Sequence, residues 1–174
     1  TIGSGGTTGP SRRARMDLMA MRGRMPHRVM FRTVHGIADA AVARWQNIPP
    51  GNGLTHALMA APAGERLEAW YTSSVGGADG TSSRFLLATQ VAVTVARLTG
   101  SKVPRPVFLP FDQAIRLAQW AEARVRAEGV AVIRGPVSRL VRVAVAPTEA
   151  GIDLPRVGMG GGGEPPPPET ATTI

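Results

Sequence analysis

The segment MFRTVHGIADAAVARWQNI, residues 30–48, carries the strongest periodic pattern in the chain. Its apolar residues recur at steps of three and four, which places them on one side of an α-helix. The segment PPGNG, residues 49–53, follows directly, and prolines with glycines end a helix. The pattern therefore predicts an amphipathic helix from about Arg28 to Asn47. Its apolar face is expected to comprise Met30, Phe31, Val34, Ile37, Ala38, Ala41, Val42, Trp45 and Ile48.

The segments that follow alternate between apolar runs and turn residues. Residues 65–72, ERLEAWYT, alternate in polarity and predict a strand. Residues 84–99 fit a strand through the alternation of Val91 with its neighbours, and they also fit a helix. Their length favours the helix, as do Ser83 before them and Gly100 after them. Residues 112–128 predict a second amphipathic helix that ends at Gly129.

Two runs rich in β-branched residues, 130–134 and 137–145, flank a Gly-Pro pair and predict an antiparallel hairpin. Trp45 closes the apolar face of the first helix and is expected in the core. The predicted fold class is α+β, with two to three amphipathic helices packed on a small antiparallel sheet and with extended N- and C-terminal arms.

Composition divides the chain into three parts. Residues 1–27 combine a Gly/Ser/Thr-rich start with arginines and predict a flexible basic N-terminal arm. Residues 28–146 hold the periodic segments and predict a single globular domain. Residues 147–174 include the run GGGGEPPPP, residues 160–168, and predict a Gly/Pro-rich C-terminal tail.

The positive charge is concentrated near the N-terminus. The net charge is +8, and of the 20 basic residues only Lys102 is a lysine. Between residues 12 and 32 the only acid is Asp17. Spaced arginines neutralise phosphates and release counterions, so nucleic acid is the predicted partner, with an acidic protein surface as the alternative. The predicted nucleic-acid-binding residues are Arg12, Arg13, Arg15, Arg22, Arg24, Arg28 and Arg32.

The residue pattern contains no recognisable catalytic or cofactor motif. There is no cysteine, which excludes disulfides and thiolate chemistry, and no Gly-x-Ser-x-Gly or Gly-Lys-Ser/Thr sequence occurs. His35 and Asp39 lie four residues apart on the predicted helix, but two ligands do not make a metal site. We therefore expect no cofactor, no metal site and no catalytic residue. No apolar run reaches the roughly 20 residues of a membrane span, so no span is expected.

These observations predict a non-enzymatic structural subunit of a large assembly. A viral or phage coat-type protein and a subunit of a ribonucleoprotein or organellar complex both fit, with the terminal arms contacting copies of the chain or neighbouring subunits. The Arg-rich arm would contact nucleic acid or an acidic neighbour. One alternative is a stand-alone nucleic-acid-binding accessory protein, and another is a small enzyme with an unrecognised site. An enzyme should show a pocket lined by groups with perturbed pKa.

Overall fold

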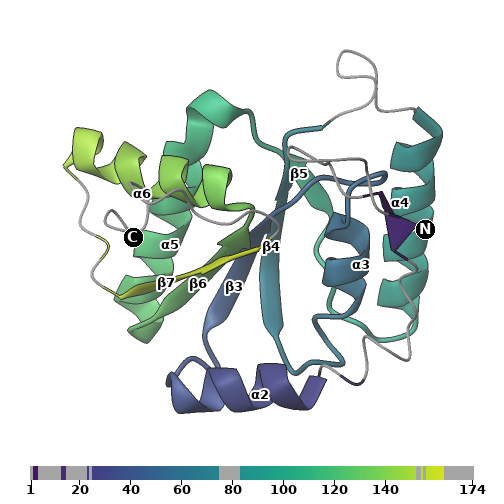
Figure 1. Cartoon of the computed structure of the whole chain (residues 1–174), viewed down its shortest axis with the longest axis horizontal. Coiled ribbons are helices and arrows are strands. Elements are labelled where there is room, and N and C mark those ends of the chain that lie inside the picture. Colours follow the sequence, from purple (N-terminus) through teal and green to yellow (C-terminus); the bar gives the residue numbers. More distant parts are fainter. Residues whose placement is uncertain are drawn as a thin grey trace.

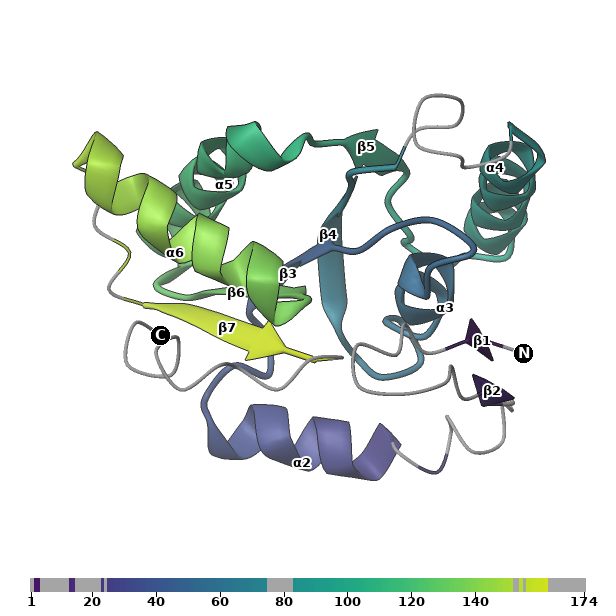
Figure 2. The ribbon, with the colours of Figure 1, turned by 45° about the horizontal axis from the view of Figure 1, so that its top comes forward.

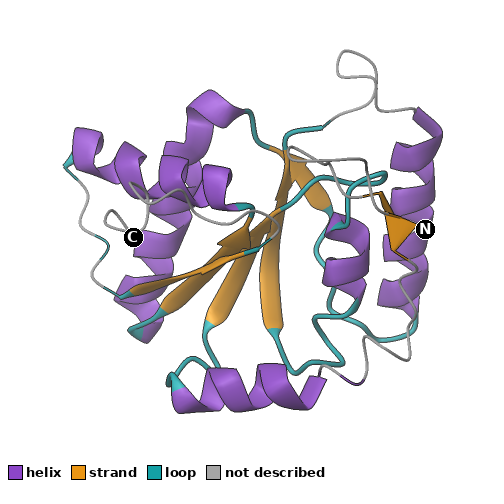
Figure 3. Ribbon diagram, viewed as in Figure 1, coloured by secondary structure: helices purple, strands orange, loops and turns teal. Residues whose placement is uncertain are grey.

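The described part of the computed structural model consists of residues 2–3, 13–14, 23, 25–74, 83–151, 154 and 156–162. Strands and helices alternate through most of it (Figure 3). After a two-residue antiparallel pair, β1 (Ile2–Gly3) with β2 (Arg13–Ala14), the chain forms α2 (Met25–Val34), β3 (Ala41–Trp45), α3 (Gly53–Leu58) and β4 (Arg66–Thr72). It continues through α4 (Ser83–Leu98), β5 (Pro106–Phe108), a short 3₁₀ helix η1 (Phe111–Gln113), α5 (Ala114–Glu128), β6 (Ala131–Gly135), α6 (Val137–Ala150) and β7 (Val157–Gly161).

The main sheet has five strands in the order β5-β4-β3-β6-β7, and every neighbouring pair is parallel. The fold class is therefore α/β, and the prediction of an α+β fold with an antiparallel sheet is wrong. The chain starts in the middle of the sheet at β3, fills one side, and returns to fill the other. Parallel neighbours require a crossover connection, which here contains α3, α4, α5 or α6.

Helices cover both faces of the sheet (Figure 1). One face packs against α5 and α6, and its core includes Trp45, Leu117 and Ile133. The other face packs against α3 and α4, and its core includes Trp70 and Val132. Figure 2 shows α2 lying apart from both pairs, below the sheet. Trp45 is fully buried, which confirms its predicted place in the core.

The first predicted helix, from Arg28 to Asn47, is half right. Its N-terminal part forms α2, but that helix ends at Val34, and Gly36 adopts a positive φ of 64° in the following turn. Residues 41–45 are instead the central strand β3, and all five are buried. A parallel strand with helices on both faces is buried on both sides, so its sequence is a continuous apolar run without the alternation typical of a half-exposed strand. Such a run also fits the three- and four-residue spacing of a helix, which is why the pattern was misleading.

The second difference concerns the predicted hairpin. Residues 131–135 form β6, but residues 137–150 form helix α6. Leu140 and Val143 are buried three residues apart, which is helical spacing, and packing against the sheet outweighs the strand preference of the valines. Strand β7 pairs with β6 at the edge of the sheet and lies within residues 147–174, the expected tail.

Three local predictions are confirmed. The strand expected at 65–72 is β4, and the helices expected at 84–99 and 112–128 are α4 and α5. Gly129 follows α5 with a φ of +81°, the left-handed conformation that ends many helices. Among the described residues, none of the helices has the length and apolar character needed to cross a membrane.

Candidate anion-binding site

A pocket of about 390 Å³ lies at the carboxyl ends of β3, β6 and β7. Strands β3 and β6 are neighbours in the sheet, yet the connections that leave them lead to opposite sides. In open α/β sheets this is the position where ligands bind, because the two connections separate and leave a crevice. The described residues lining the pocket are Arg28, Arg44, Gln46, Asn52, His56, Arg134, Gly135, Pro136, Gly160, Gly161 and Gly162.

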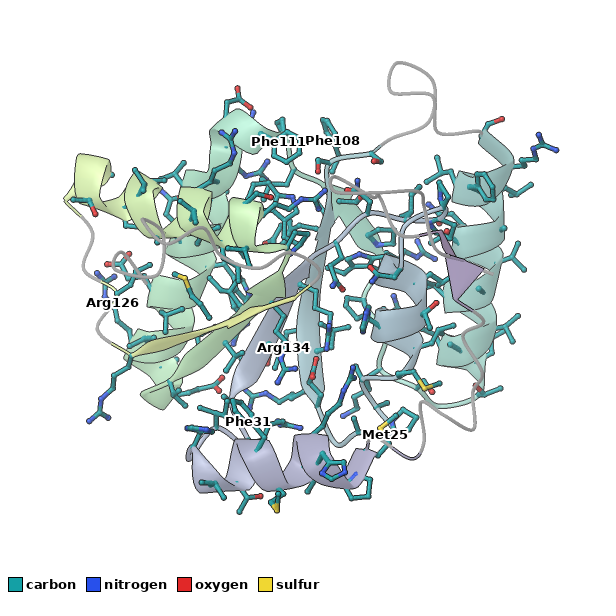
Figure 4. The ribbon with its side chains drawn as sticks, in the orientation of Figure 1. Met25, Phe31, Phe108, Phe111, Arg126 and Arg134 are labelled. Carbon is teal, nitrogen blue, oxygen red and sulfur yellow. The ribbon has the colours of Figure 1, made fainter. Side chains whose placement is uncertain are left out.

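Three arginines from separate elements meet in this pocket. Arg44 on β3 and Arg134 on β6 are register partners, so their side chains leave the same face of the sheet. In Figure 4, Arg134 lies beside the central strands, above α2. Arg28 comes from α2 and completes the set. The sheet and α2 thus direct three guanidinium groups into one cavity.

Glu65, at the start of β4, is the acidic partner of this cluster. Its Oε1 accepts hydrogen bonds from Nη2 of Arg44 at 2.6 Å and from Nε of Arg44 at 3.0 Å. Its Oε2 lies 3.8 Å from Nε of Arg134, an ion pair too long for a hydrogen bond. None of the described lining residues is acidic. Glu65 thus pairs with two of the three arginines, which leaves an excess of positive charge in the pocket.

Several polar atoms of the pocket are buried without a hydrogen-bond partner among the described residues. Nη1 of Arg28 and Nε of Arg134 are the two donors, and Oε1 of Gln46 and Nδ1 of His56 are the other atoms. A buried donor without an acceptor costs about 1–3 kcal/mol, and more when the group is charged. An anion that supplied oxygen acceptors would satisfy both guanidinium groups.

The environment also shifts two pKa values. Burial lowers the pKa of Arg44, while the neighbouring Glu65 opposes this shift. Burial is the main cause that lowers the pKa of His56 to about 4, and the positive charges of Arg44 and Arg28 add to it. His56 is therefore a neutral imidazole at pH 7. The pocket combines fixed cations with one uncharged group that can donate or accept a hydrogen bond.

The loop after β3 is held firmly behind the pocket. Nε1 of Trp70 donates to the Gln46 carbonyl at 2.8 Å. Oδ1 of Asn47 accepts from the Ser73 backbone N–H at 3.2 Å and from Nη2 of Arg139 at 2.8 Å. A Cβ on Gly53 would lie 2.5 Å from the Asn47 carbonyl oxygen, so only glycine fits there. These contacts fix the position of Gln46 at the carboxyl edge.

The predicted arginine set has three different outcomes in the structure. Arg28 lines the pocket. Arg32 is only 4% exposed, and its guanidinium donates to the carbonyls of Gly64, at 2.7 Å, and of Ala63 and Ala38. Arg32 thus braces α2 against neighbouring loops and does not face solvent. For Arg13 only the backbone, in β2, is described. Arg12, Arg15, Arg22 and Arg24 lie outside the described residues.

His35 and Asp39 do not form the i,i+4 pair on one helix that the sequence predicted. Helix α2 ends at Val34, so His35 and Asp39 lie in the turn that follows it and do not share a helical face. Within the described ranges, no group of three or more histidine, cysteine, aspartate or glutamate side chains could hold a metal ion.

Sequence reasoning missed four residues of the cluster: Arg44, Glu65, Arg134 and His56. Arg44 and Arg134 carried a usable signal, because each is a charged residue inside a short apolar run of strand-like composition. Buried charge is rare unless it is paired or functional. Comparisons of the chain with protein-family models, curated proteins and solved structures find no match.

Proposed function

We propose that this protein binds a phosphate-bearing polyanion, nucleic acid in the first place, and that the pocket of Arg28, Arg44 and Arg134 holds one of its phosphate groups. The observation that carries the proposal is the convergence of three guanidinium groups on a cavity where, among the described residues, only Glu65 offers a paired carboxylate. Phosphate supplies the charge and the several acceptor oxygens that planar guanidinium groups bind best.

The position of Arg28 supports a polymeric ligand. Helix α2 begins at Met25, directly after the Arg-rich residues 12–24. A nucleic-acid strand in contact with those arginines would continue along α2 toward the pocket. Each phosphate neutralised on this path releases counterions, so binding should weaken steeply as salt is added.

Binding measurements on pocket variants test the proposal. Arg28→Gln and Arg134→Gln each remove one cation with a buried nitrogen that has no hydrogen-bond partner among the described residues. A charge-assisted hydrogen bond contributes about 1.5–3 kcal/mol, so each variant should weaken oligonucleotide and pyrophosphate binding roughly tenfold to a hundredfold. Arg126→Gln is the matched control, because Arg126 has a side chain 76% exposed on α5.

Unchanged affinity in both pocket variants would refute the site. Isothermal titration calorimetry with pyrophosphate separates the pocket from the arm, because pyrophosphate is too short to follow the whole Arg-rich segment. Release of inorganic phosphate from the ligand during these titrations would instead favour the hypothesis of a small enzyme. His56, with its lowered pKa, would then be the first residue to substitute.

A second candidate function is that of a subunit in a larger assembly, and the outer surface of α4 favours it. Leu87, Val91 and Leu98 are 65%, 54% and 82% exposed. No charged residue occurs between Arg84 and Arg97 on this helix. Contiguous exposed apolar surface of this kind supports contact with a neighbouring subunit.

The assembly proposal is tested by the particle size of surface variants. Leu87→Gln with Leu98→Gln should shift the protein to a smaller species on a sizing column, and the melting temperature of that species should not fall. Val145→Gln is the control, because Val145 is a 41% exposed valine on α6. An unchanged elution volume for the α4 variant would remove this surface from the assembly.

A further inference from the structure

A second group of side chains outside the pocket lies at the same edge of the sheet. Phe108 is the last residue of β5, and Phe111 opens the 3₁₀ helix η1 three residues later. Both rings point outward at the upper edge of the molecule in Figure 4. Phe108 is 42% exposed and Phe111 is 47% exposed. Exposed aromatic rings that lie together form an apolar patch, and such patches mark binding sites more often than single exposed residues do.

Cations surround the Phe111 ring. The guanidinium carbon of Arg139 lies 5.4 Å from the ring centroid, and that of Arg142 lies 5.5 Å from it. The buried ring of Trp45 lies 5.9 Å from the same centroid, tilted by 38°. A guanidinium group within about 6 Å of an aromatic centroid is attracted to the ring. Phe111 is thus held in place on its inner side while about half of it faces solvent.

Arg139 is itself anchored, which makes the arrangement rigid. Its Nη1 donates to the Trp45 carbonyl at 3.0 Å, and its Nη2 donates to Oδ1 of Asn47 at 2.8 Å. The side chain is only 7% exposed. These contacts hold the Phe111 ring against the carboxyl end of β3. A preorganised ring loses little freedom when a ligand stacks on it.

We infer that Phe111, with Arg139 and Arg142 against its ring, is a stacking platform for an unpaired nucleobase. A flat base would cover the exposed part of the ring, and the exposed Arg142 would neutralise the phosphate beside it. Aromatic rings with neighbouring arginines bind single strands in this way without reading sequence. Bases in a duplex are already stacked on each other, so the platform selects single strands.

Charge at this edge favours a nucleic acid over an apolar protein segment. Arg116 on α5 follows Phe111 by five residues in the chain, whereas Asp112 is the one acid of η1. A phosphate backbone complements the positive charge of Arg116 and of the exposed Arg142, whereas an apolar segment offers neither of them a counterion. The inference rests on the proposed function for the nature of the ligand, but it concerns residues separate from the arginine pocket.

The test compares three ligands of equal length: single-stranded oligothymidylate, the same strand with abasic sites, and a duplex. All carry the backbone phosphates, but only the first offers unpaired bases. The wild-type protein should bind the thymidylate strand roughly five-fold to a hundred-fold more tightly than the abasic strand. Phe111→Ala should abolish this difference and leave abasic-strand affinity unchanged.

Control variants separate this inference from the proposed function. Phe85→Ala removes a 39% exposed phenylalanine on α4 and should keep the thymidylate preference. Phe111→Leu keeps an apolar side chain without an aromatic face, and it should lose the preference without loss of folding. Equal affinity of the wild-type protein for the thymidylate and abasic strands would overturn the platform and leave phosphate binding intact. Loss of abasic-strand binding in Arg134→Gln, with no effect of Phe111→Ala on any ligand, would overturn the platform as well.

Discussion

Substitution of Glu65 by glutamine separates the stability of the arginine cluster from its affinity for anions. Glu65 is 5% exposed, and its carboxylate pairs with Arg44 at 2.6 Å and with Arg134 at 3.8 Å. Glutamine keeps the shape but removes the charge, so the pocket cations lose their counterion. Loss of one partner in a buried ion pair costs about 3–5 kcal/mol. For a chain of this size that corresponds to a fall in melting temperature of roughly 6–20 °C.

The same substitution should increase the response to anions. Inorganic phosphate is expected to bind only the folded protein, so it raises the free energy of unfolding, by about 2.7 kcal/mol at a hundredfold excess over the dissociation constant. Glu65→Gln leaves more uncompensated positive charge than the wild-type pocket and should therefore bind phosphate more tightly. Thermal unfolding over a phosphate titration, at constant ionic strength, measures both effects.

A matched surface variant gives the baseline. Glu122→Gln breaks the ion pair with Arg126, whose side chain is 76% exposed. Such pairs contribute only about 0.3–0.5 kcal/mol, so this variant should melt close to the wild type and gain no extra phosphate response. A Glu65→Gln protein that melts within about 1 °C of wild type would refute the energetic reasoning. Equal phosphate responses in the Glu65→Gln and wild-type proteins would refute the anion site.

Three further predictions concern the pocket, its support and the N-terminal segment. Because the pKa of His56 is lowered from 6.5 to about 4, the unfolded chain takes up a proton that the folded protein excludes. The free energy of unfolding should fall by up to about 3 kcal/mol as the pH drops from 6.5 toward 4, and urea unfolding of His56→Gln should lack this contribution. Gly53→Ala places a Cβ 2.5 Å from the Asn47 carbonyl oxygen and should destabilise the fold by about 1–3 kcal/mol. Gly162→Ala, where nothing lies within 4 Å, should be neutral in the same assay. Substitution of Arg12, Arg13 and Arg15 by alanine should reduce, by roughly 2, the slope of the logarithm of the single-strand binding constant against the logarithm of the salt concentration. The melting temperature should not change.

The elements predicted correctly are those with local start and stop signals. Helix α5 ends at Gly129, and α4 lies between Ser83 and Gly100, so composition alone marks their limits. The central strand β3 has no such signal. It is buried on both faces, and this burial is set by helices distant in the sequence. Its apolar run therefore fits a helix and a strand equally well, and the choice between them is made by tertiary packing.

The errors after β6 have a different origin. Composition treats valine as a strand former, but Val137, Leu140 and Val143 lie on one side of α6 and pack onto the sheet. The segment of β7 is rich in glycine, so its composition suggests a linker. It forms a strand nevertheless, because its pairing with β6 is made by backbone groups and needs few side chains. The predicted antiparallel pairing required a strand at residues 137–145, but that segment is helical, and β6 pairs in parallel with β3 and β7 instead.

The only property of the candidate site that the sequence predicted is its positive charge. The predicted arginine set included Arg28, which lines the pocket, yet the count of charges cannot show that Arg32 turns inward to backbone carbonyls. Arg44 and Arg134 are 90 residues apart in the chain and meet only because β3 and β6 are neighbours. Convergence of that kind is a property of sheet topology, which the sequence pattern did not reveal.

Glycines of β7 line one side of the pocket, where they leave space that a side chain would fill. A Cβ on Gly158 would meet Val132 and the Ala131 carbonyl oxygen at ordinary contact distances, whereas a Cβ on Gly160 would lie 3.3 Å from Cγ of Arg134. The bare main chain at Gly160 leaves the stem of Arg134 room to lie across the strand. A bulkier residue at that one position would push the guanidinium toward the opening and shrink the space beside it. If the pocket binds an anion as proposed, substitution of Gly160 would be one way to change the size of the anion that fits beside Arg134.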